Sequence, residues 1–275
     1  MAQRSALINV MSAAAGKAGR VLVRAFGEIE GLQVSKKGPA DFVSEADHRA
    51  EKILFEELSK ARPNYGFVME EGGGVGFVME EGGGVAGSDT SNTWIIDPLD
   101  GTLNFLHGLP HFAISIALKR DSKLFAGLIY APASDDLFWA EKGKGAFLNG
   151  HRLRVSSRRV TAESLFATGI PFAGRKGHEP FLAQLEHVMA VAAGVRRYGS
   201  AALDLAYVAA GRYEGFWEQG LYPWDMAAGI VLVREAGGFV SDFNGRGEML
   251  SSGTIIASND AQHCVLQKLL KQEDG

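Results

Sequence analysis

Apolar residues recur at helical spacing in several segments of the chain. Within residues 5–26 the apolar run is interrupted by Lys17, Arg20 and Arg24, which predicts an amphipathic helix rather than a membrane span or the core of a signal peptide. Residues 47–60 carry apolar side chains on one side and charges on the other, which predicts a surface helix. Three more helices are expected at 179–193, 201–210 and 225–236, the last two ending at Gly211 and Gly237. Ser200 is expected as the N-cap of the helix at 201–210, and Asp260 as an N-cap near the end of the chain.

Other segments have the short apolar runs typical of strands. Strands are expected at 112–118, 124–130 and 137–140, followed by a hairpin turn at Asn149-Gly150. They predict an antiparallel sheet in an N-terminal α+β lobe, residues 1–155. In residues 156–275 helices alternate with short apolar strands, which predicts a C-terminal α/β lobe. The two lobes together are expected to form one domain of the α/β (α+β) class; the short strands are placed near Leu165, Gly215, Phe239 and Ile255.

Composition narrows the class of protein. The chain has 275 residues, 46% hydrophobic and 22% charged, which is enough for one large domain or two joined lobes. The net charge of −4 gives no electrostatic footprint for direct nucleic-acid binding. The single cysteine, Cys264, excludes an internal disulfide and is expected to be a buried helix residue. With neither an export nor a membrane-anchoring signal recognised, a cytoplasmic protein is expected.

The segment Asp97-Pro98-Leu99-Asp100-Gly101-Thr102 follows a strand-like apolar run and carries the clearest chemistry. In a turn set by Pro98 and Gly101, both carboxylates and the Leu99 carbonyl can converge on a hard cation such as Mg²⁺. Gly101 and Thr102 would then begin a helix whose unpaired N–H groups attract phosphate. The alternative is an ordinary turn, because Asp, Pro and Gly dominate turns for reasons unrelated to catalysis.

Residues 66–75 are repeated letter for letter as residues 76–85. Two copies of ten residues cannot stack into a repeat architecture, so an in-frame insertion explains them better. Each copy ends a strand-like run with two glutamates and three glycines, the layout of a strand that delivers a carboxylate to a site. Only one copy can occupy that place, which leaves Glu70 and Glu80 as alternatives. Solvated surface is the competing interpretation for either pair.

Asp225 is the fourth acidic candidate. It lies in Trp224-Asp225-Met226-Ala227-Ala228-Gly229, where a carboxylate begins an apolar helix. A rigid carboxylate beside a metal would fit this position. An acidic residue that interacts favourably with the helix dipole would fit it as well.

Taken in order along the chain, these motifs resemble those of the inositol monophosphatase family, and the resemblance covers nearly the whole chain. The matching segments are 41–47 (DFVSEAD), Glu70-Glu71, 97–102 (DPLDGT) and 224–229 (WDMAAG); residues 196–206 (RRYGSAALDLA) are similar to bacterial members of the extragenic-suppressor, SuhB-like type. The resemblance implies a layered αβαβα sugar-phosphatase fold, Mg²⁺ dependence, lithium sensitivity and a homodimer. Departures are Ser44, where the family usually has Thr, and Tyr222, where some animal members have His.

The resemblance also implies residue roles. Glu70 or Glu80, Asp97 and the Leu99 carbonyl would hold one metal ion, and Asp97, Asp100 and Asp225 a second. Thr102, with Asp47 and the glutamate, would position and deprotonate the attacking water. The spacing from Asp47 favours Glu70, although the spacing to Asp97 favours Glu80. Glu70 is preferred, because family members vary in length after the glutamates and a glycine-rich loop tolerates insertion. Substrate contacts would come from Asp100, Gly101, Thr102, Ala201, Glu218 and Asp225.

The implied reaction is hydrolysis of a small phosphomonoester, with myo-inositol 1-phosphate favoured because Glu218 matches a position that binds substrate hydroxyls. Histidinol phosphate and fructose 1,6-bisphosphate are alternatives within related families. An alternative of another class is a binding partner of the transcription machinery in ribosomal RNA synthesis. Arg196 and Arg197 could serve such a surface, although paired arginines are more often solvated or at a dimer interface.

Overall fold

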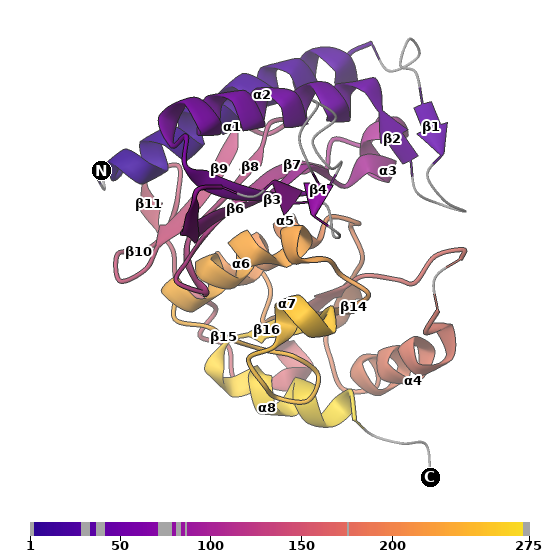
Figure 1. The fold of residues 1–275 in the computed structure, drawn as a ribbon. Helices are drawn as coiled ribbons and strands as arrows, with labels where there is room; N and C mark the ends of the chain where they lie inside the picture. The colour runs from indigo at the N-terminus through magenta and orange to yellow at the C-terminus, as the bar shows by residue number, and fades with distance from the viewer. Residues whose placement is uncertain are drawn as a thin grey trace.

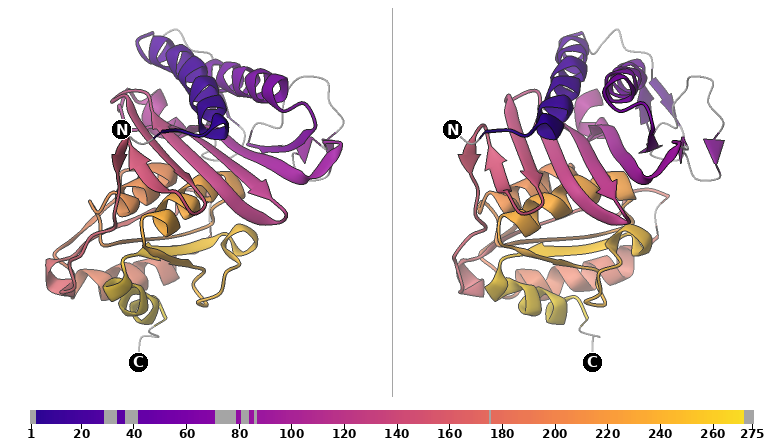
Figure 2. Two further views of the ribbon diagram at one scale, coloured as in Figure 1. Left: turned by 90° about the vertical axis from the view of Figure 1, so that its left-hand side faces the viewer. Right: turned by 60° about the vertical axis from the view of Figure 1, so that its left-hand side comes forward.

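The computed structural model describes residues 3–28, 45–70, 87–174 and 176–271 in full, and the backbone alone at 34–36, 42–44, 79–80 and 84–85. Within these residues the chain forms five layers in the order helix, sheet, helix, sheet, helix (Figure 1; Figure 2). The layered αβαβα fold expected from the resemblance is therefore confirmed.

The larger sheet has nine strands among the described residues, in the order β11-β10-β9-β8-β7-β6-β3-β5-β4. Most neighbouring strands are antiparallel, whereas β3 and β6 run parallel. The strands are β3 (Tyr65–Met69), β4 (Met79–Glu80), β5 (Gly84–Val85), β6 (Asp89–Asp100), β7 (Ala113–Arg120), β8 (Lys123–Ala131), β9 (Asp136–Glu141), β10 (Gly145–Leu148) and β11 (His151–Arg152). A separate pair is formed by β1 (Val34–Lys36) and β2 (Phe42–Ser44).

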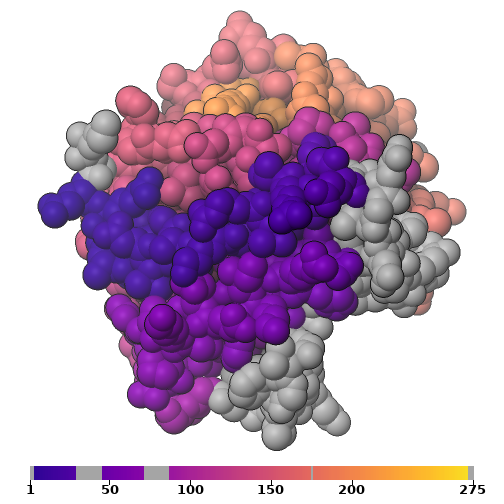
Figure 3. All heavy atoms as spheres, turned by 90° about the horizontal axis from the view of Figure 1, so that it is seen from above, coloured from indigo at the N-terminus to yellow at the C-terminus, as the bar shows by residue number. Residues whose placement is uncertain are grey.

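Helices α1 (Ala6–Phe26) and α2 (Glu45–Ala61) cover the outer face of this sheet. Their apolar sides pack on the sheet and bury a common core that includes Leu22, Leu54 and Trp94. Figure 3 looks onto this layer, where the atoms of α1 and α2 lie side by side. By length and composition α1 is also apolar enough to cross a membrane. In this fold it packs against α2 and β8, as the predicted amphipathic helix would.

The smaller sheet has the order β13-β12-β14-β16-β15 within the described residues. Its strands are β12 (Leu165–Thr168), β13 (Gly194–Arg196), β14 (Gly215–Gln219), β15 (Phe239–Ser241) and β16 (Thr254–Ser258). Helices α5 (Ala201–Ala209) and α6 (Pro223–Glu235) lie between the two sheets, and α4 (His178–Met189) and α8 (Asp260–Leu269) cover the far face. Two short helices, α3 (Thr102–Leu106) and α7 (Met249–Ser252), and a 3-10 turn at Thr161–Glu163 complete the described elements.

Close packing of α6 on the larger sheet depends on Gly127 in β8. A Cβ at this position would lie 2.5 Å from the carbonyl oxygen of Ala228, which is backbone and cannot move aside. The close approach fixes how far α6 stands from the sheet, and therefore where the first turn of α6 meets the end of β6.

One local prediction, the hairpin turn, is confirmed here, and three others are wrong. Asn149 and Gly150 have φ of 47° and 86°, as the expected hairpin turn requires. Cys264 is exposed rather than buried, because it lies on the outer side of α8. The N-cap of α8 is Asn259, whose side chain accepts from the Gln262 N–H, and not Asp260. Helix α4 ends at Met189, before the predicted end at residue 193, because β13 begins at Gly194.

Candidate active site

The end of β6 carries two acidic candidates, Asp97 and Asp100. Asp97 is opposite Ser115 on β7 and Asp100 is opposite Ala113. An advance of three residues along β6 is therefore paired with an advance of two residues along β7. This is a β-bulge, which re-aims side chains at the end of a strand. The sequence predicted a tight turn here, and that is wrong: the segment is a bulged strand in which the Leu99 N–H donates to Asp97 Oδ1 over 2.9 Å.

Immediately after β6, Gly101 has φ of 90° and precedes α3. A Cβ at Gly101 would lie 3.0 Å from the His111 carbonyl oxygen, so both the conformation and the space require glycine. Thr102 then begins α3, and its hydroxyl donates to the Leu99 carbonyl oxygen over 2.9 Å. The predicted helix start at Gly101 and Thr102 is confirmed.

Asp225 reaches the same place from the first turn of α6. Its Oδ2 accepts a hydrogen bond of 2.7 Å from the Tyr222 N–H, so the carboxylate does close the start of the helix. The start of α6 is tied to the larger sheet, because the Ser115 hydroxyl donates to the Trp224 carbonyl oxygen over 3.1 Å. Asp225 is therefore a helix-capping carboxylate held rigidly at the end of β6. This geometry suits both an acidic residue that stabilises the start of the helix and a carboxylate placed to hold a metal ion.

Asp97, Asp100 and Asp225 each place one carboxylate oxygen within 4.8 Å of the others. Burial, and then the negative charges of Glu70, Asp100, Asp225 and Asp47, raise the pKa of Asp97 well above its ordinary value. Burial and the charge of Asp100 likewise raise the pKa of Asp225. Several negative carboxylates close together in a buried site repel one another, and a bound cation would neutralise this repulsion.

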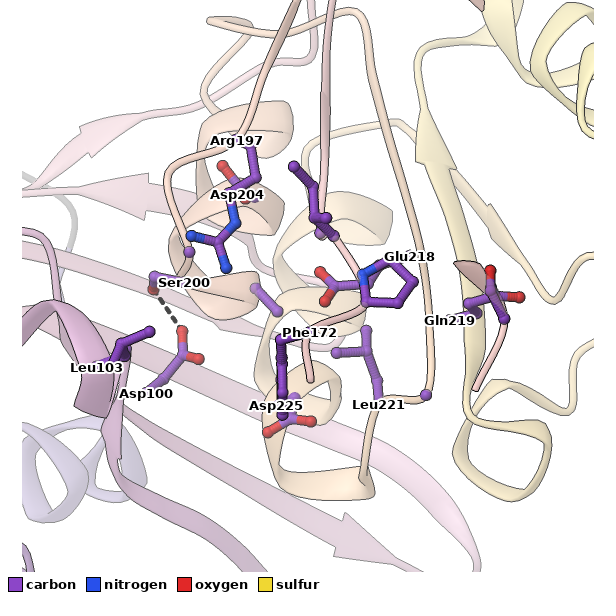
Figure 4. A pocket seen from close by; sticks show the side chains of 18 of the residues that line it. Asp100, Leu103, Phe172, Arg197, Ser200, Asp204, Glu218, Gln219, Leu221 and Asp225 are labelled. Carbon is purple, nitrogen blue, oxygen red and sulfur yellow. Dashed lines mark hydrogen bonds between the residues drawn. The ribbon is translucent and has the colours of Figure 1, made fainter. Parts of the chain in front are cut away.

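Hydrogen bonds partly stabilise the charge on Asp100. The Ser200 hydroxyl donates to Asp100 Oδ2 (Figure 4), and the Ala202 N–H donates to the same oxygen over 2.9 Å. Burial nevertheless raises the pKa of Asp100 from 3.8 to about 6, with these bonds and the Ala201 N–H opposing the shift. All the donors in the cluster are oxygen atoms, which suits a hard divalent cation better than a soft metal.

Glu70 and Asp47 lie close enough to the three aspartates for their charges to raise the pKa of Asp97. Glu70 follows β3, whose last residue Met69 is opposite Ile96 on the parallel strand β6. Parallel neighbours end at the same edge, so Glu70 comes next to Asp97 and its charge raises the pKa of Asp97. Asp47 is buried in the first turn of α2, and its charge acts on Asp97 in the same direction.

Glu80 belongs to a different strand from Glu70. Its backbone lies in β4, which is separated from β3 by β5. The side chain of Glu80 and most of the repeat, at 71–78 and 81–83, lie outside the described residues. Sheet order therefore favours Glu70 as the glutamate beside Asp97.

A cavity of about 540 Å³ opens beside Asp100 and Asp225. Among its lining residues are the predicted substrate contacts Asp100, Gly101, Thr102, Ala201, Glu218 and Asp225, and also Gly169, Phe172, Arg197, Ser200 and Asp204. Glu218 projects from β14 into this space (Figure 4). Its side chain fits because residue 169 is glycine: a Cβ there would lie 1.9 Å from the Glu218 carboxyl carbon.

Sequence reasoning did not assign Ser200, Arg197 or Asp204 to this wall. Ser200 was predicted only as an N-cap, which it is, since its hydroxyl accepts from the Leu203 N–H over 3.3 Å; the same hydroxyl also donates to Asp100. Arg197 was considered for an outer surface but lines the cavity, and Asp204 was not singled out. The helical spacing of Ser200, Ala201 and Asp204 was the available signal, since one end of a helix presents all three.

The raised carboxyl pKa values predict how stability depends on pH when no metal is bound. Between pH 3.8 and about 6, Asp100 is mostly protonated in the folded protein and mostly ionised in the unfolded chain. The folded state therefore binds more protons in this window, and the free energy of unfolding falls as pH rises through it. Asp100 alone accounts for up to about 3 kcal/mol of that fall. Urea unfolding in EDTA at pH 4.5 and 7.0 measures about two thirds of this fall. An Asp100→Asn variant should lose less stability over the same interval, and an identical loss would contradict the assignment.

Comparisons with known proteins show which family the chain matches. The chain matches the model of the inositol monophosphatase family over residues 3–273. It is 56% identical over 269 residues to an inositol-1-monophosphatase of Mesorhizobium japonicum, covering 98% of this chain and 97% of that protein. It is 45% identical over 255 residues to a Pseudomonas aeruginosa protein named Nus factor SuhB, covering 92% and 91%. The crystal structure of extragenic suppressor protein suhB from Bartonella henselae has a TM-score of 0.92 and 54% identity, covering 98% of this chain and 100% of that one.

Proposed function

The chain belongs to the inositol monophosphatase family, and we propose that it is a Mg²⁺-dependent enzyme that hydrolyses myo-inositol 1-phosphate to inositol and inorganic phosphate. One observation carries the proposal. Asp100 and Asp225, which converge with Asp97, line a cavity into which Glu218 projects from β14. A charged phosphoryl group and a polar leaving group can thus be bound side by side in one cavity.

The residues fit a divalent cation. Glu70, Asp97 and the Leu99 carbonyl would hold one ion, and Asp97, Asp100 and Asp225 a second, so that Asp97 is shared. Burial and mutual repulsion already raise the pKa values of these aspartates, which is the electrostatic condition that a cation relieves. When bound, Mg²⁺ supplies positive charge for the phosphoryl oxygens and the departing alkoxide, and makes water more acidic.

The chain's own groups have distinct tasks in the reaction. The N–H groups that begin α3 donate to the phosphate. The Thr102 hydroxyl, oriented by its bond to the Leu99 carbonyl oxygen, positions the attacking water, and the carboxylates of Asp47 and Glu70 accept its proton. In-line attack then breaks the bond between phosphorus and the ester oxygen without forming a phosphoenzyme, and the departing alkoxide takes a proton from solvent water to become the polyol. Glu218, Asp225 and the Ala201 backbone bind hydroxyl groups of the leaving polyol.

Substrate choice is tested with a panel of phosphate esters. We expect kcat/KM for myo-inositol 1-phosphate to exceed the values for histidinol phosphate and fructose 1,6-bisphosphate, and lithium to inhibit the reaction. Phosphate release measured with each ester, with and without Mg²⁺, makes the comparison. Faster hydrolysis of another ester would keep the mechanism and reject the proposed substrate.

A second candidate function rests on the relatives named Nus factor SuhB, from Pseudomonas aeruginosa and Escherichia coli. For this chain it would be a binding role in the transcription machinery that makes ribosomal RNA. A role of this kind should survive loss of the metal site. Binding of an Asp97→Asn variant to transcription factors in a pull-down distinguishes the two functions, because hydrolysis by the same variant should be lost.

The assembly and location expected from the family are also proposals. We propose a cytoplasmic homodimer that acts on a small-molecule substrate, and contacts neither membrane nor nucleic acid directly. Exposed apolar side chains such as Leu182 and Met189 support self-association, because they lie two turns apart on one side of α4. Light scattering coupled to gel filtration measures the oligomeric state, and a monomer at micromolar concentration would reject the dimer.

Deletion of residues 76–85 should leave a folded enzyme at least as active as the parent. The Gly84-Val85 strand pairs with Phe67-Val68, and the deletion puts an identical Gly74-Val75 in its place. The connection shortens from about 15 residues to about 5, which stabilises the pairing by about 1 kcal/mol. Thermal unfolding and phosphate release by the deletion protein measure both effects. Loss of folding would mean that the second copy is structurally required.

A further inference from the structure

Asp204 is a buried carboxylate that the proposed metal chemistry does not use. It lies one turn into α5 with 1% of its surface exposed, and its Oδ1 atom has no hydrogen-bond partner. The side chain nevertheless forms part of the wall of the 540 Å³ cavity. A buried acceptor without a donor costs free energy, so folding alone gives no reason to keep it there.

Local structure does not explain this carboxylate. The N-cap of α5 is Ser200, whose hydroxyl accepts from the Leu203 N–H, so α5 does not need Asp204 as a cap. The converging oxygens of the metal cluster belong to Asp97, Asp100 and Asp225. Among the described residues, no ion pair joins Arg197 to Asp204; the guanidinium only lowers the Asp204 pKa from a distance, against the larger effect of burial.

The position of Asp204 relative to Glu218 suggests what it binds. Asp204 and Glu218 line the same cavity, and after burial the Glu218 carboxylate makes the largest contribution to raising the Asp204 pKa. Figure 4 shows Asp204 on α5 and Glu218 on β14, both in the wall of the cavity next to Asp100 and Asp225. If the phosphate binds at the Asp100 and Asp225 side of the cavity, the carboxyl groups of Asp204 and Glu218 can accept hydrogen bonds from two hydroxyls of one leaving group.

Resting on the proposed function, we propose that Asp204 is a specificity-determining residue that accepts a hydrogen bond from a hydroxyl of the polyol and works with Glu218 to select leaving groups with at least two hydroxyls. A substrate without those hydroxyls leaves the buried carboxylate without a donor and is disfavoured. A substrate that supplies them satisfies an acceptor that the protein itself leaves unpaired. This is the arrangement that gives large discrimination between a hydroxyl and its absence.

The test compares two esters in one protein. Myo-inositol 1-phosphate carries the hydroxyls, whereas 4-nitrophenyl phosphate has a leaving group with none. For Asp204→Ala we expect the ratio of their kcat/KM values to fall on the order of 10- to 100-fold, mainly through the inositol ester. Asp204→Asn keeps one acceptor oxygen and the side-chain shape, so its ratio should fall less. Glu218→Gln should reduce the same ratio.

Two further measurements distinguish substrate binding by Asp204 from an indirect role through Arg197 and from a failure to fold. If Asp204 only positioned Arg197, an Arg197→Gln variant would reproduce the fall in the ratio, and Asp204→Ala in that background would add nothing. Under the proposal the second substitution still reduces the ratio. Thermal unfolding identifies variants that fail to fold. Asp204→Asn should unfold no earlier than the parent, because it removes a carboxyl group whose charged form burial disfavours.

Failure of this inference differs from failure of the proposed function. An unchanged ratio in a folded Asp204→Ala variant, when the parent prefers the inositol ester, would overturn the role of Asp204 alone. A parent that hydrolyses 4-nitrophenyl phosphate but not the inositol ester would overturn both. A parent that hydrolyses neither would reject the proposed function at its metal site.

Discussion

Replacing Asp97 by Asn is expected to lower kcat about a thousandfold or more in a protein that remains folded. Asp97 is one of the three converging carboxylates, and burial and then the charges of Glu70, Asp100, Asp225 and Asp47 raise its pKa. An amide keeps the shape of the side chain and its bond from the Leu99 N–H, but removes the negative charge shared between the two proposed metal positions.

The same substitution should affect stability in the opposite direction. Without metal, the buried charge of Asp97 repels its neighbours, so the Asp97→Asn protein in EDTA should unfold at a higher temperature than the parent. Mg²⁺ should raise the unfolding temperature of the parent and leave that of the variant nearly unchanged. Phosphate release and thermal unfolding measure the two effects. Undiminished turnover by the folded variant would refute the metal assignment.

The two copies of the repeat provide an internal control for the second large effect. Glu70→Gln should lower kcat/KM about a hundredfold or more, because Glu70 follows β3 and lies next to Asp97. Glu80→Gln changes the same residue in an identical local sequence, but its strand β4 is separated from β3 by β5. We expect the Glu80→Gln protein to remain within about threefold of the parent.

Steady-state kinetics with myo-inositol 1-phosphate compares the pair, and thermal unfolding verifies that both variants fold. A severe loss in Glu80→Gln with little change in Glu70→Gln would assign the site to the second copy. Equal losses in both would contradict the argument from sheet order.

Features encoded within a few residues could be predicted from the sequence. The amphipathic pattern of residues 47–60 gave α2, and Asn149-Gly150 gave the β10–β11 hairpin. The short spacing of Asp97, Asp100 and Thr102 similarly indicated that these residues would lie close together. Each of these depends on spacing along one strand, helix or turn, which the sequence contains directly.

Features that depend on how strands are ordered could not be predicted in this way. The choice between Glu70 and Glu80 was left open, because two identical segments have the same local preferences and only the parallel pairing of β3 with β6 separates them. Asp204 was missed for a similar reason. Its helical spacing from Ala201 was a signal within the sequence, but the cavity that it shares with Glu218 depends on how α5 packs against β14.

The most direct test of the central claim is a Mg²⁺ titration of phosphate release from myo-inositol 1-phosphate, with protein first freed of metal by EDTA. The central claim is that Asp97, Asp100 and Asp225 form a divalent-cation site for hydrolysis of a phosphate monoester. We predict no release without Mg²⁺, saturable recovery as Mg²⁺ is added, and no recovery in the Asp97→Asn variant. Equal release with and without Mg²⁺ would contradict the account.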